Sequence, residues 1–263
     1  MLEKLRPMTA DDIPSALGLS TEAGWNQTAD DWKMLLELAP NSCFAIEVEG
    51  TLAASTTLLC YGCKLAWIGM VLTTEKYRGR GFARRLLEEA LTHADRRKIE
   101  SVKLDATDQG RPLYETMGFR FEQPVERWAK GGSGDFPRNV ESNWPDDPED
   151  VFGADRSQLL NKLAERNPPL TTSRSYLFTR PGRQTNHFGP GVGESPEDAR
   201  TLAERALQSG SWYWDLLPNN TNAVALAEDL GFAPQRHLSR MVRGKDLRGK
   251  EGAIYAIAGF ELG

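Results

Sequence analysis

The chain contains a weak internal repeat, and no other feature restricts its fold as strongly. Residues 113–119 (LYETMGF) align with residues 226–232 (LAEDLGF), and an arginine stands eight residues beyond the phenylalanine in both copies. A glycine follows twelve residues beyond each phenylalanine, and residues 86–91 (LLEEAL) align with residues 202–207 (LAERAL). Because several matches occur in the same order, we infer a tandem duplication of one unit.

The composition excludes several classes of protein. No stretch without charged residues reaches the about 20 apolar residues that cross a bilayer, and the N-terminus shows no apolar signal core. We therefore expect a cytoplasmic protein with no membrane partner. The net charge of −5 argues against a nucleic-acid partner. Three cysteines and three scattered histidines predict neither a disulfide framework nor a metal site.

A linker signal separates the two copies. Residues 130–135 (KGGSGD) are followed by a proline-rich stretch up to Pro148. We predict a first domain over residues 1–130, a linker over 131–147 and a second domain over 148–263. Strand and helix signals alternate in the first domain, which predicts an α/β (α+β) fold. The predicted strands cover residues 2–6, 43–48, 51–59, 65–73 and 101–104, and the predicted helices cover 29–38, 82–97 and 111–117, with Thr9 capping an earlier helix.

The most informative segment is residues 77–83 (YRGRGFA), between an apolar strand and a long helix. Free N–H groups at a helix N-terminus bind anions, and glycines let the backbone approach them closely. No Ser, Thr, Asp or Asn stands at the cap position, and Arg78 and Arg80 add positive charge. These features suit a pyrophosphate, although a glycine-rich turn with two solvated arginines is the alternative.

The second copy serves as an internal comparison. The alignment places Ser195-Pro196-Glu197 where Gly79-Arg80-Gly81 stand in the first copy. Serine as N-cap, proline at the first position and acids in the first turn satisfy a helix start internally, and the carboxylates repel a phosphate. The same helix end is therefore predicted to be open to an anion in the first copy and closed in the second.

These motifs resemble a known family. Arg78-x-x-Gly81-x-Ala83 after an apolar strand resembles the acyl-CoA-binding motif of the GNAT superfamily of N-acetyltransferases, and residues 113–119 resemble its later motif. The match covers roughly residues 1–129. The whole chain resembles a tandem GNAT subfamily with a complete N-terminal and a degenerate C-terminal mixed-sheet domain. The segments that carry this looser resemblance are residues 24–26, 151–156, 180–182 and 255–259.

The resemblance implies where acetyl-CoA binds and how it reacts. Pantetheine would pair with the strand edge at Val71, Leu72 and Thr73. The pyrophosphate would lie on residues 78–84, which are Arg78, Gly79, Arg80, Gly81, Phe82, Ala83 and Arg84. Acetyl would move directly to an amine in a ternary complex, with acetyl-CoA as the co-substrate and no metal. Cys60 and Cys63 have no flanking base that would support a covalent route.

The same resemblance makes Tyr114 the acid that stabilises or protonates the leaving thiolate, whereas the second copy has Ala227 there. We therefore expect the second copy to catalyse nothing. The base is not fixed by the motifs; Asp105 is the first candidate and Glu22 and Asp30 are others, although a surface carboxylate or a helix cap is the simpler explanation of each.

Trp25 and Asn26 are predicted to contact the acceptor, because they lie in the loop between the first two helices; a lid over the core is the alternative role for Trp25. His187, Trp212, Trp214 and Asp215 are further possible contributors from the second domain, although two tryptophans on one strand face are typical of a core.

The leading hypothesis is an acetyl-CoA-dependent N-acetyltransferase that acts on a small-molecule or exposed peptide amine. The alternative is a non-catalytic acyl-CoA-binding sensor. A third possibility is a nucleic-acid patch formed by residues 78–81 together with Arg84 and Arg85. The acidic isoelectric point of about 5.4 and the neighbouring Glu88 and Glu89 disfavour it. The sequence leaves the acceptor and the oligomeric state open.

Overall fold

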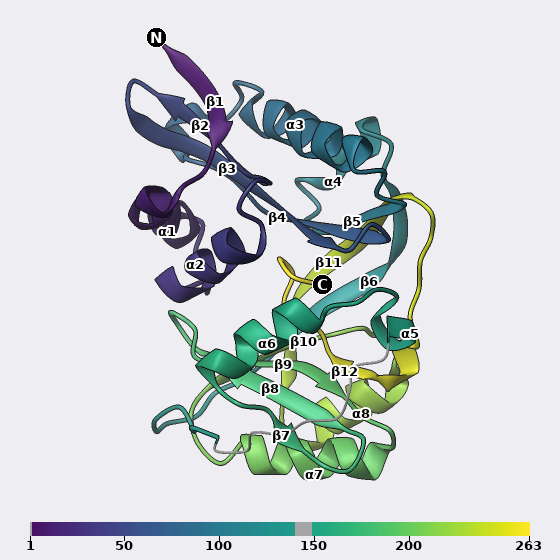
Figure 1. Cartoon of the computed structure of the whole chain (residues 1–263). Coiled ribbons are helices and arrows are strands. Elements are labelled where there is room, and N and C mark those ends of the chain that lie inside the picture. The colour runs from purple at the N-terminus through teal and green to yellow at the C-terminus, as the bar shows by residue number, and fades with distance from the viewer. Residues whose placement is uncertain (1, 140–148) are drawn as a thin grey trace.

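The computed structural model describes residues 2–139 and 149–263, so residues 140–147 of the expected linker lie outside the described residues. We call residues 2–130 the N-terminal half and residues 149–263 the C-terminal half (Figure 1). The N-terminal half contains β1 (Glu3–Pro7), η1 (Ala10–Asp12), α1 (Ile13–Glu22), α2 (Ala29–Leu38), β2 (Cys43–Val48), β3 (Thr51–Tyr61), β4 (Leu65–Thr73), η2 (Glu75–Tyr77), α3 (Phe82–Arg96), β5 (Ser101–Ala106), α4 (Arg111–Thr116) and β6 (Arg120–Lys130). The C-terminal half contains α5 (Glu149–Phe152), α6 (Ser157–Arg166), β7 (Leu170–Thr171), β8 (Tyr176–Arg180), β9 (Asn186–Val192), α7 (Pro196–Ala206), β10 (Trp212–Leu216), α8 (Thr221–Asp229), β11 (Ala233–Gly244), η3 (Glu251–Ala253) and β12 (Ile254–Ala256).

Local sequence accounts for several of these elements. The predicted helix over residues 29–38 is confirmed, and Thr28 and Asp31 cap it reciprocally. The predicted β2–β3 hairpin is also confirmed. Its two-residue turn has positive φ at both Glu49 and Gly50, as the tight turns of right-twisted hairpins require. Thr9 and Asp12 form the expected capping box, although a short 3₁₀ turn precedes α1.

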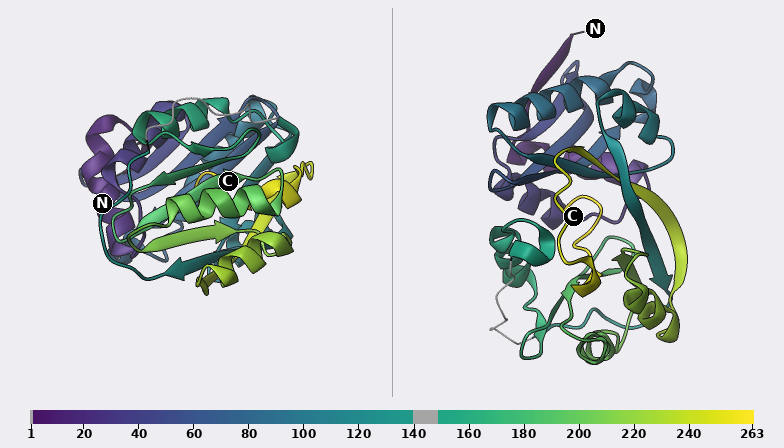
Figure 2. Two further views of the ribbon diagram at one scale, coloured as in Figure 1. Left: turned by 90° about the horizontal axis from the view of Figure 1, so that it is seen from below. Right: turned by 90° about the vertical axis from the view of Figure 1, so that its right-hand side faces the viewer.

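The two halves exchange strands within one continuous sheet. Among the described residues the strand order is β1-β2-β3-β4-β5-β11-β6-β10-β9-β8-β7, with β12 paired to β9. Strand β11 of the C-terminal half therefore lies between β5 and β6 of the N-terminal half. Strand β6 lies in turn between β11 and β10. Figure 2 shows both long strands running from one half to the other.

The sheet of the N-terminal half is covered on both faces. Helix α3 packs Phe82, Leu86 and Leu87 on one face, against Ile46 and Leu58 of the sheet. Helices α1 and α2 cover the other face, where their core is continuous with α6 of the C-terminal half.

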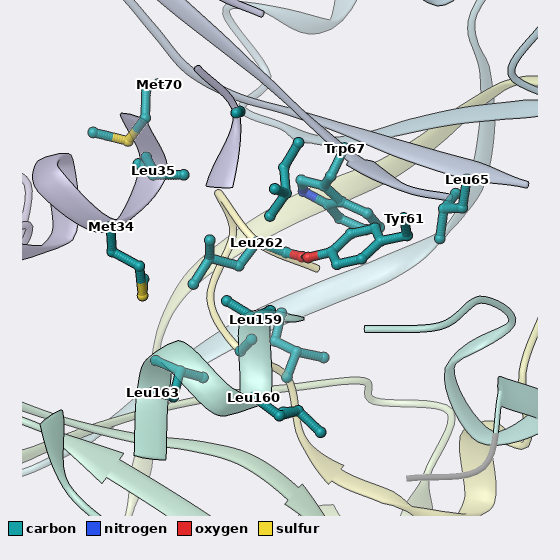
Figure 3. Packing of buried hydrophobic residues seen from close by; sticks show 14 of the residues in the cluster. Met34, Leu35, Tyr61, Leu65, Trp67, Met70, Leu159, Leu160, Leu163 and Leu262 are labelled. Atoms are coloured by element: carbon teal, nitrogen blue, oxygen red, sulfur yellow. The ribbon is translucent and has the colours of Figure 1, made fainter. Parts of the chain in front are cut away.

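The closing segment of the chain, residues 257–263, lies in the core between the halves. Leu262 lies beside Tyr61 and Trp67 and close to Leu159 of α6 (Figure 3). The indole N–H of Trp67 donates a hydrogen bond to the carbonyl of Phe260 at 2.9 Å. A Cβ atom at Gly69 would come within 2.8 Å of the Glu261 carbonyl oxygen, so a glycine is required for this close approach. The C-terminal half thus reaches the middle of β4.

Candidate active site

A cavity lies where β4 and β5 diverge. The two parallel strands pair only from Leu65 to Trp67 on β4, and beyond this point they separate. The space between them is a cavity of about 100 Å³. It is lined by Trp25, Gln27, Ile68, Gly69, Met70, Val71, Leu104, Asp105, Thr107, Tyr114, Arg127, Arg236, Leu238, Phe260 and Glu261.

A β-bulge in β4 shapes one wall of this cavity. Ser55 of β3 opposes Leu72 and Thr57 opposes Gly69, so β4 carries one extra residue between them. Met70 in this bulge has a φ of +51°, in the left-handed region that a non-glycine residue rarely adopts. The bulge turns the edge of β4 that carries Val71, Leu72 and Thr73 away from β5. The described strands leave that edge without a sheet partner.

The N-terminus of α3 has the open form predicted from the sequence. Its cap residue is Gly81, with a φ of +77°, and no side chain of the described residues caps the helix. A Cβ atom at Gly79 or Gly81 would meet nothing within 4 Å, so the loop surface is open. The N–H groups of the first turn, from Phe82 to Arg84, are therefore available to a phosphate.

The four arginine and aromatic side chains of this loop have different surroundings. Arg78 is exposed and bonds the Thr73 carbonyl weakly, at 3.4 Å. Arg80 pairs with Glu3 at 2.6 Å, and Arg84 bonds the Thr116 hydroxyl at 2.9 Å. Phe82 is buried in the core, and the Arg80 guanidinium lies 5.2 Å from the centre of its ring. Arg78 is consequently the side chain of this set most free to reach an anion.

Tyr114 lies on α4 and lines the cavity, with 9% of its surface exposed. Gly110 provides room for its ring, because a Cβ atom there would come within 3.0 Å of Tyr114 Cε2. Within the described residues the Tyr114 hydroxyl makes no hydrogen bond to the protein. Burial raises the pKa of Tyr114 to about 12. The phenol is therefore neutral at physiological pH and able to donate a proton into the cavity.

Asp105 also lines the cavity, but both of its carboxylate oxygens are engaged. Arg240 of β11 donates from Nε to Oδ1 at 2.9 Å and from Nη2 to Oδ2 at 3.0 Å. The side chain of Asp105 is fully buried, and burial raises its pKa against the opposing effect of Arg240. A carboxylate held by a bidentate guanidinium is a poor proton acceptor, because the adjacent positive charge favours its ionised form and one lone pair on each oxygen is already used.

Glu261 is a carboxylate in the same cavity that sequence reasoning did not identify. The hydrogen bond that it accepts from another side chain of the described residues is long, 3.3 Å from Arg180 Nη2 to Oε1. Burial raises the pKa of Glu261, with Arg180 acting in the opposite direction. No local signal marks this residue, because the closing segment reaches the cavity only through the contact between the halves.

The predicted acceptor residues divide into two groups. Trp25 lines the cavity, and so does its neighbour Gln27, whose buried Oε1 has no hydrogen-bond partner in the part of the chain that the structure describes. Asn26 instead holds the turn before β9: its Nδ2 donates to the Thr185 carbonyl at 2.8 Å and its Oδ1 accepts from Gln184 N at 2.9 Å. The side-chain amide of Asn26 is thus used in the contact between the halves.

The other carboxylates named from the sequence lie outside the cavity. Glu22 is exposed and accepts a hydrogen bond from the Glu75 N–H at 2.6 Å. Asp30 is exposed in the first turn of α2. Neither residue belongs to the lining of the cavity.

The corresponding region of the C-terminal half is closed. Ser195 caps α7 by accepting a hydrogen bond from the Asp198 N–H at 3.1 Å, as the sequence predicted. Strand β9 pairs with β10 over residues 186–188, and beyond this point it pairs with β12 at Gly191 and Val192. The equivalent stretch of β4 is free. Trp212 and Trp214 belong to the hydrophobic core of this half, in agreement with the core alternative.

Two structural features are absent from the described ranges, 2–139 and 149–263. No helix there is long and apolar enough to span a membrane. No group of three or more His, Cys, Asp or Glu side chains there is arranged to hold a metal ion.

A mixed sheet that splits between two parallel strands, next to a glycine-rich loop opening a helix, defines an acyl-CoA-dependent acyltransferase fold. The model of the acetyltransferase (GNAT) family matches residues 11–119, and that of an acetyltransferase (GNAT) domain matches residues 148–256. The chain therefore belongs to the GNAT acetyltransferases and contains two GNAT domains in tandem.

Similar proteins match the chain over most or all of its length. The chain is 22% identical to the uncharacterized N-acetyltransferase YitH of Bacillus subtilis, over 100% of this chain and 99% of that protein. It is 25% identical to holothin acyltransferase of a Pseudoalteromonas species, over 91% of this chain and 87% of that protein. A putative acetyltransferase from Pyrococcus horikoshii has the same fold, with a TM-score of 0.82 and 22% identity over 99% of this chain and 96% of that one.

Proposed function

We propose that this acetyltransferase moves an acetyl group from acetyl-CoA directly to a primary amine, within a ternary complex of enzyme, thioester and acceptor. The observation that carries the proposal is that a neutral phenol, Tyr114, and a buried carboxylate, Glu261, line one cavity at the divergence of β4 and β5. A proton donor and a proton acceptor in one small space are what aminolysis of a thioester requires.

The residues present fit acetyl-CoA as co-substrate. The unpaired edge of β4 at Val71–Thr73 suits the amide groups of pantetheine, and the open N-terminus of α3 with Arg78 suits the pyrophosphate. The thioester is the acyl donor. The enzyme therefore has to position it, remove a proton from the amine and donate a proton to the leaving thiolate.

Tyr114 serves the leaving group. A thiol has a pKa of about 8.5, and a neutral phenol of higher pKa can hydrogen-bond the thiolate and protonate it late in the reaction. Its lack of a hydrogen-bond partner within the described residues leaves its proton directed at whatever fills the cavity.

Glu261, rather than Asp105, is our assignment for the general base. An alkylammonium of pKa about 10 is only ~0.1% neutral at pH 7, a deficit of about 4 kcal/mol, so a base lowers the barrier considerably. The raised pKa of Glu261 brings it closer to the working pH, and its carboxylate is less fully bonded than that of Asp105. The base would then come from the C-terminal half.

The cysteines offer little support for a covalent acetyl-enzyme. Cys43 is buried, and burial raises its pKa to about 12. Burial also raises the pKa of Cys60, which lines a separate cleft of about 530 Å³. A thiol with a raised pKa is a weak nucleophile at neutral pH.

Steady-state kinetics test the proposal. Purified protein is assayed for release of the CoA thiol from acetyl-CoA with a panel of small and peptide amines. Initial rates measured over a grid of both substrates should give intersecting double-reciprocal lines, whereas parallel lines would indicate a covalent intermediate. Binding of CoA without acetylation of any amine would favour a sensor of acyl-CoA instead.

A further inference from the structure

Among the described residues, the charged side chains that line the candidate active site form ion pairs, with one exception. Asp105 pairs with Arg240, Arg127 pairs with Asp215 with both contacts at 2.7 Å, and Glu261 pairs with Arg180 at 3.3 Å. The members of these pairs that line the cavity are Asp105, Arg127 and Glu261. In each pair one positive charge meets one negative charge.

Arg236 is the exception. It lies on β11, is half-buried and lines the same cavity, and the described residues provide it with no hydrogen-bond or ion-pair partner. Its neighbour across the strand pair is Arg127, another cation, in direct register. Like charges in this position repel each other, and Asp215 is already held by both contacts from Arg127.

The electrostatic consequence is a positive charge without an ion-pair partner in the wall of the cavity. Burial lowers the pKa of Arg236 and Arg127 lowers it further, while Asp215 acts in the opposite direction. A half-buried guanidinium has lost part of its hydration, and no direct hydrogen bond or ion pair from the described residues replaces it. An anion that enters the cavity would correct this imbalance, and a guanidinium fork fits a carboxylate in a bidentate manner.

A second polar group in the wall lacks a partner. Gln27 Oε1 is buried and accepts no hydrogen bond from any described residue. A buried acceptor left without a donor is energetically unfavourable. An amine or ammonium group is a donor of the kind that this oxygen lacks. Arg236 therefore suits a carboxylate and Gln27 suits an amine, so a ligand that carries both groups would satisfy both residues.

We propose that the acceptor of this enzyme is an amino-acid-type molecule, in which the amine that receives the acetyl group and a carboxylate belong to the same small molecule. The carboxylate binds the guanidinium of Arg236, and the amine lies toward Gln27 and Glu261. Trp25, Leu238 and Phe260 provide the apolar remainder of the wall for a side chain. This inference rests on the proposed function of the same site, and it adds the class of acceptor.

The test compares amino acids with their decarboxylated amines. Each standard amino acid is paired with the amine that lacks only its α-carboxylate, for example phenylalanine with phenethylamine and lysine with cadaverine. For at least one pair, kcat/KM of the amino acid should exceed that of the amine by about 30-fold or more, the size expected for a partly buried charge pair. Equal values for every pair would overturn the proposal.

Variants connect the preference to the residue. Arg236→Gln should remove the advantage of the preferred amino acid, about 30-fold, while leaving the decarboxylated amine and the KM for acetyl-CoA unchanged. Arg236→Lys should restore part of it. Arg243→Gln is the matched control, because Arg243 lies on the same strand but pairs with the exposed Asp95. A loss that is equal for both members of a pair, or a raised KM for acetyl-CoA, would contradict the assignment.

Calorimetry separates this inference from the proposed function. The same pairs are titrated into wild-type and Arg236→Gln protein saturated with CoA. Arg236-dependent binding of an amino acid without turnover would support the carboxylate site and contradict the proposed acetyl transfer. Acetylation of amines with no preference for a carboxylate would support the proposed acetyl transfer and contradict the carboxylate site. Absence of binding by every amino acid would also overturn the inference.

Discussion

Arg127 of β6 binds both carboxylate oxygens of Asp215 in β10, and this contact repeats, with the halves exchanged, the contact between Arg240 and Asp105. The two arginines occupy equivalent positions of the internal repeat, eight residues beyond its phenylalanine. Each reaches an aspartate in the sheet of the other half. The arginine–aspartate pair also occurs in the C-terminal half, whose site is closed. We therefore infer that both pairs hold the exchanged strands β6 and β11 in the sheet.

Asp105→Asn should therefore lower stability more than it alters chemistry. The change leaves Arg240 buried beside a neutral amide, and breaking a buried pair costs about 3–5 kcal/mol. We expect a marked drop in the melting temperature, while the protein that remains folded retains most of its kcat. Unchanged unfolding together with a loss of turnover of about 100-fold would instead restore Asp105 as the base.

Glu261→Gln should reduce kcat by roughly 10²–10⁴-fold, as expected for the loss of a general base. The wild-type rate needs ionised Glu261, and burial raises its pKa, so activity should fall on the acid side at a higher pH than for an ordinary glutamate. This acid limb should disappear in the variant. Glu194→Gln, which changes an exposed carboxylate of the same half, serves as the control. An unaltered pH profile in Glu261→Gln would exclude the assignment.

Tyr114→Phe should lower kcat by about 10²-fold or more with little change in the affinity for acetyl-CoA, since only the hydroxyl is removed. The raised pKa of about 12 also predicts that any basic limb due to Tyr114 lies above the physiological range. Tyr255→Phe is the matched control, because that tyrosine belongs to the core of the C-terminal half. Equal turnover in Tyr114→Phe and wild type would assign the residue a packing role.

Gly81→Glu should abolish CoA binding. It places a carboxylate at the open N-terminus of α3, as Glu197 does at the closed N-terminus of α7, and that charge repels a phosphate. The left-handed backbone adds a strain of about 1–2 kcal/mol. Gly231→Glu, at a φ of +81° and also in open space, carries the same strain away from the loop. Calorimetry with CoA should show loss of affinity only in Gly81→Glu; retained affinity would refute the phosphate-loop assignment.

Titration of the wild-type protein with CoA should give a single site per chain. In the C-terminal half, β12 pairs with the edge of β9 that corresponds to the unpaired edge of β4. In addition, Ser195 caps α7, and Ala227 stands where the N-terminal half has Tyr114. A second CoA would have to displace a paired strand. Two equivalent sites in the calorimetric isotherm would contradict this description of the C-terminal half.

The sequence predicted local features that depend on neighbouring residues. The capping box at Thr28 and Asp31 and the turn at Glu49 and Gly50 are decided by short-range hydrogen bonds and by allowed φ values. The open cap at Gly81 follows from the absence of a capping side chain, which a sequence shows directly. The α/β class, the duplication and the GNAT family are likewise confirmed.

The roles that the sequence left open depend on contacts between distant segments. The sequence predicts Asn26 as an acceptor residue, but its side-chain amide bonds the turn at Gln184 and Thr185, about 160 positions further along the chain. The role of Asp105 depends on its ion pair with Arg240, which lies 135 positions away in the chain. A sequence does not show whether an aspartate is paired or free.

The sequence by itself determined the two-fold repeat, most elements of the first unit, and which unit has a glycine-rich helix start without a capping side chain, because helix caps, glycine turns and strand patterns are local properties. Only the tertiary structure decided that β6 and β11 change places and that Phe260 and Glu261 line the cavity. These contacts bring Arg236 and Glu261 beside Tyr114, and they arise from strand pairing and burial between the halves, for which no short-range pattern codes.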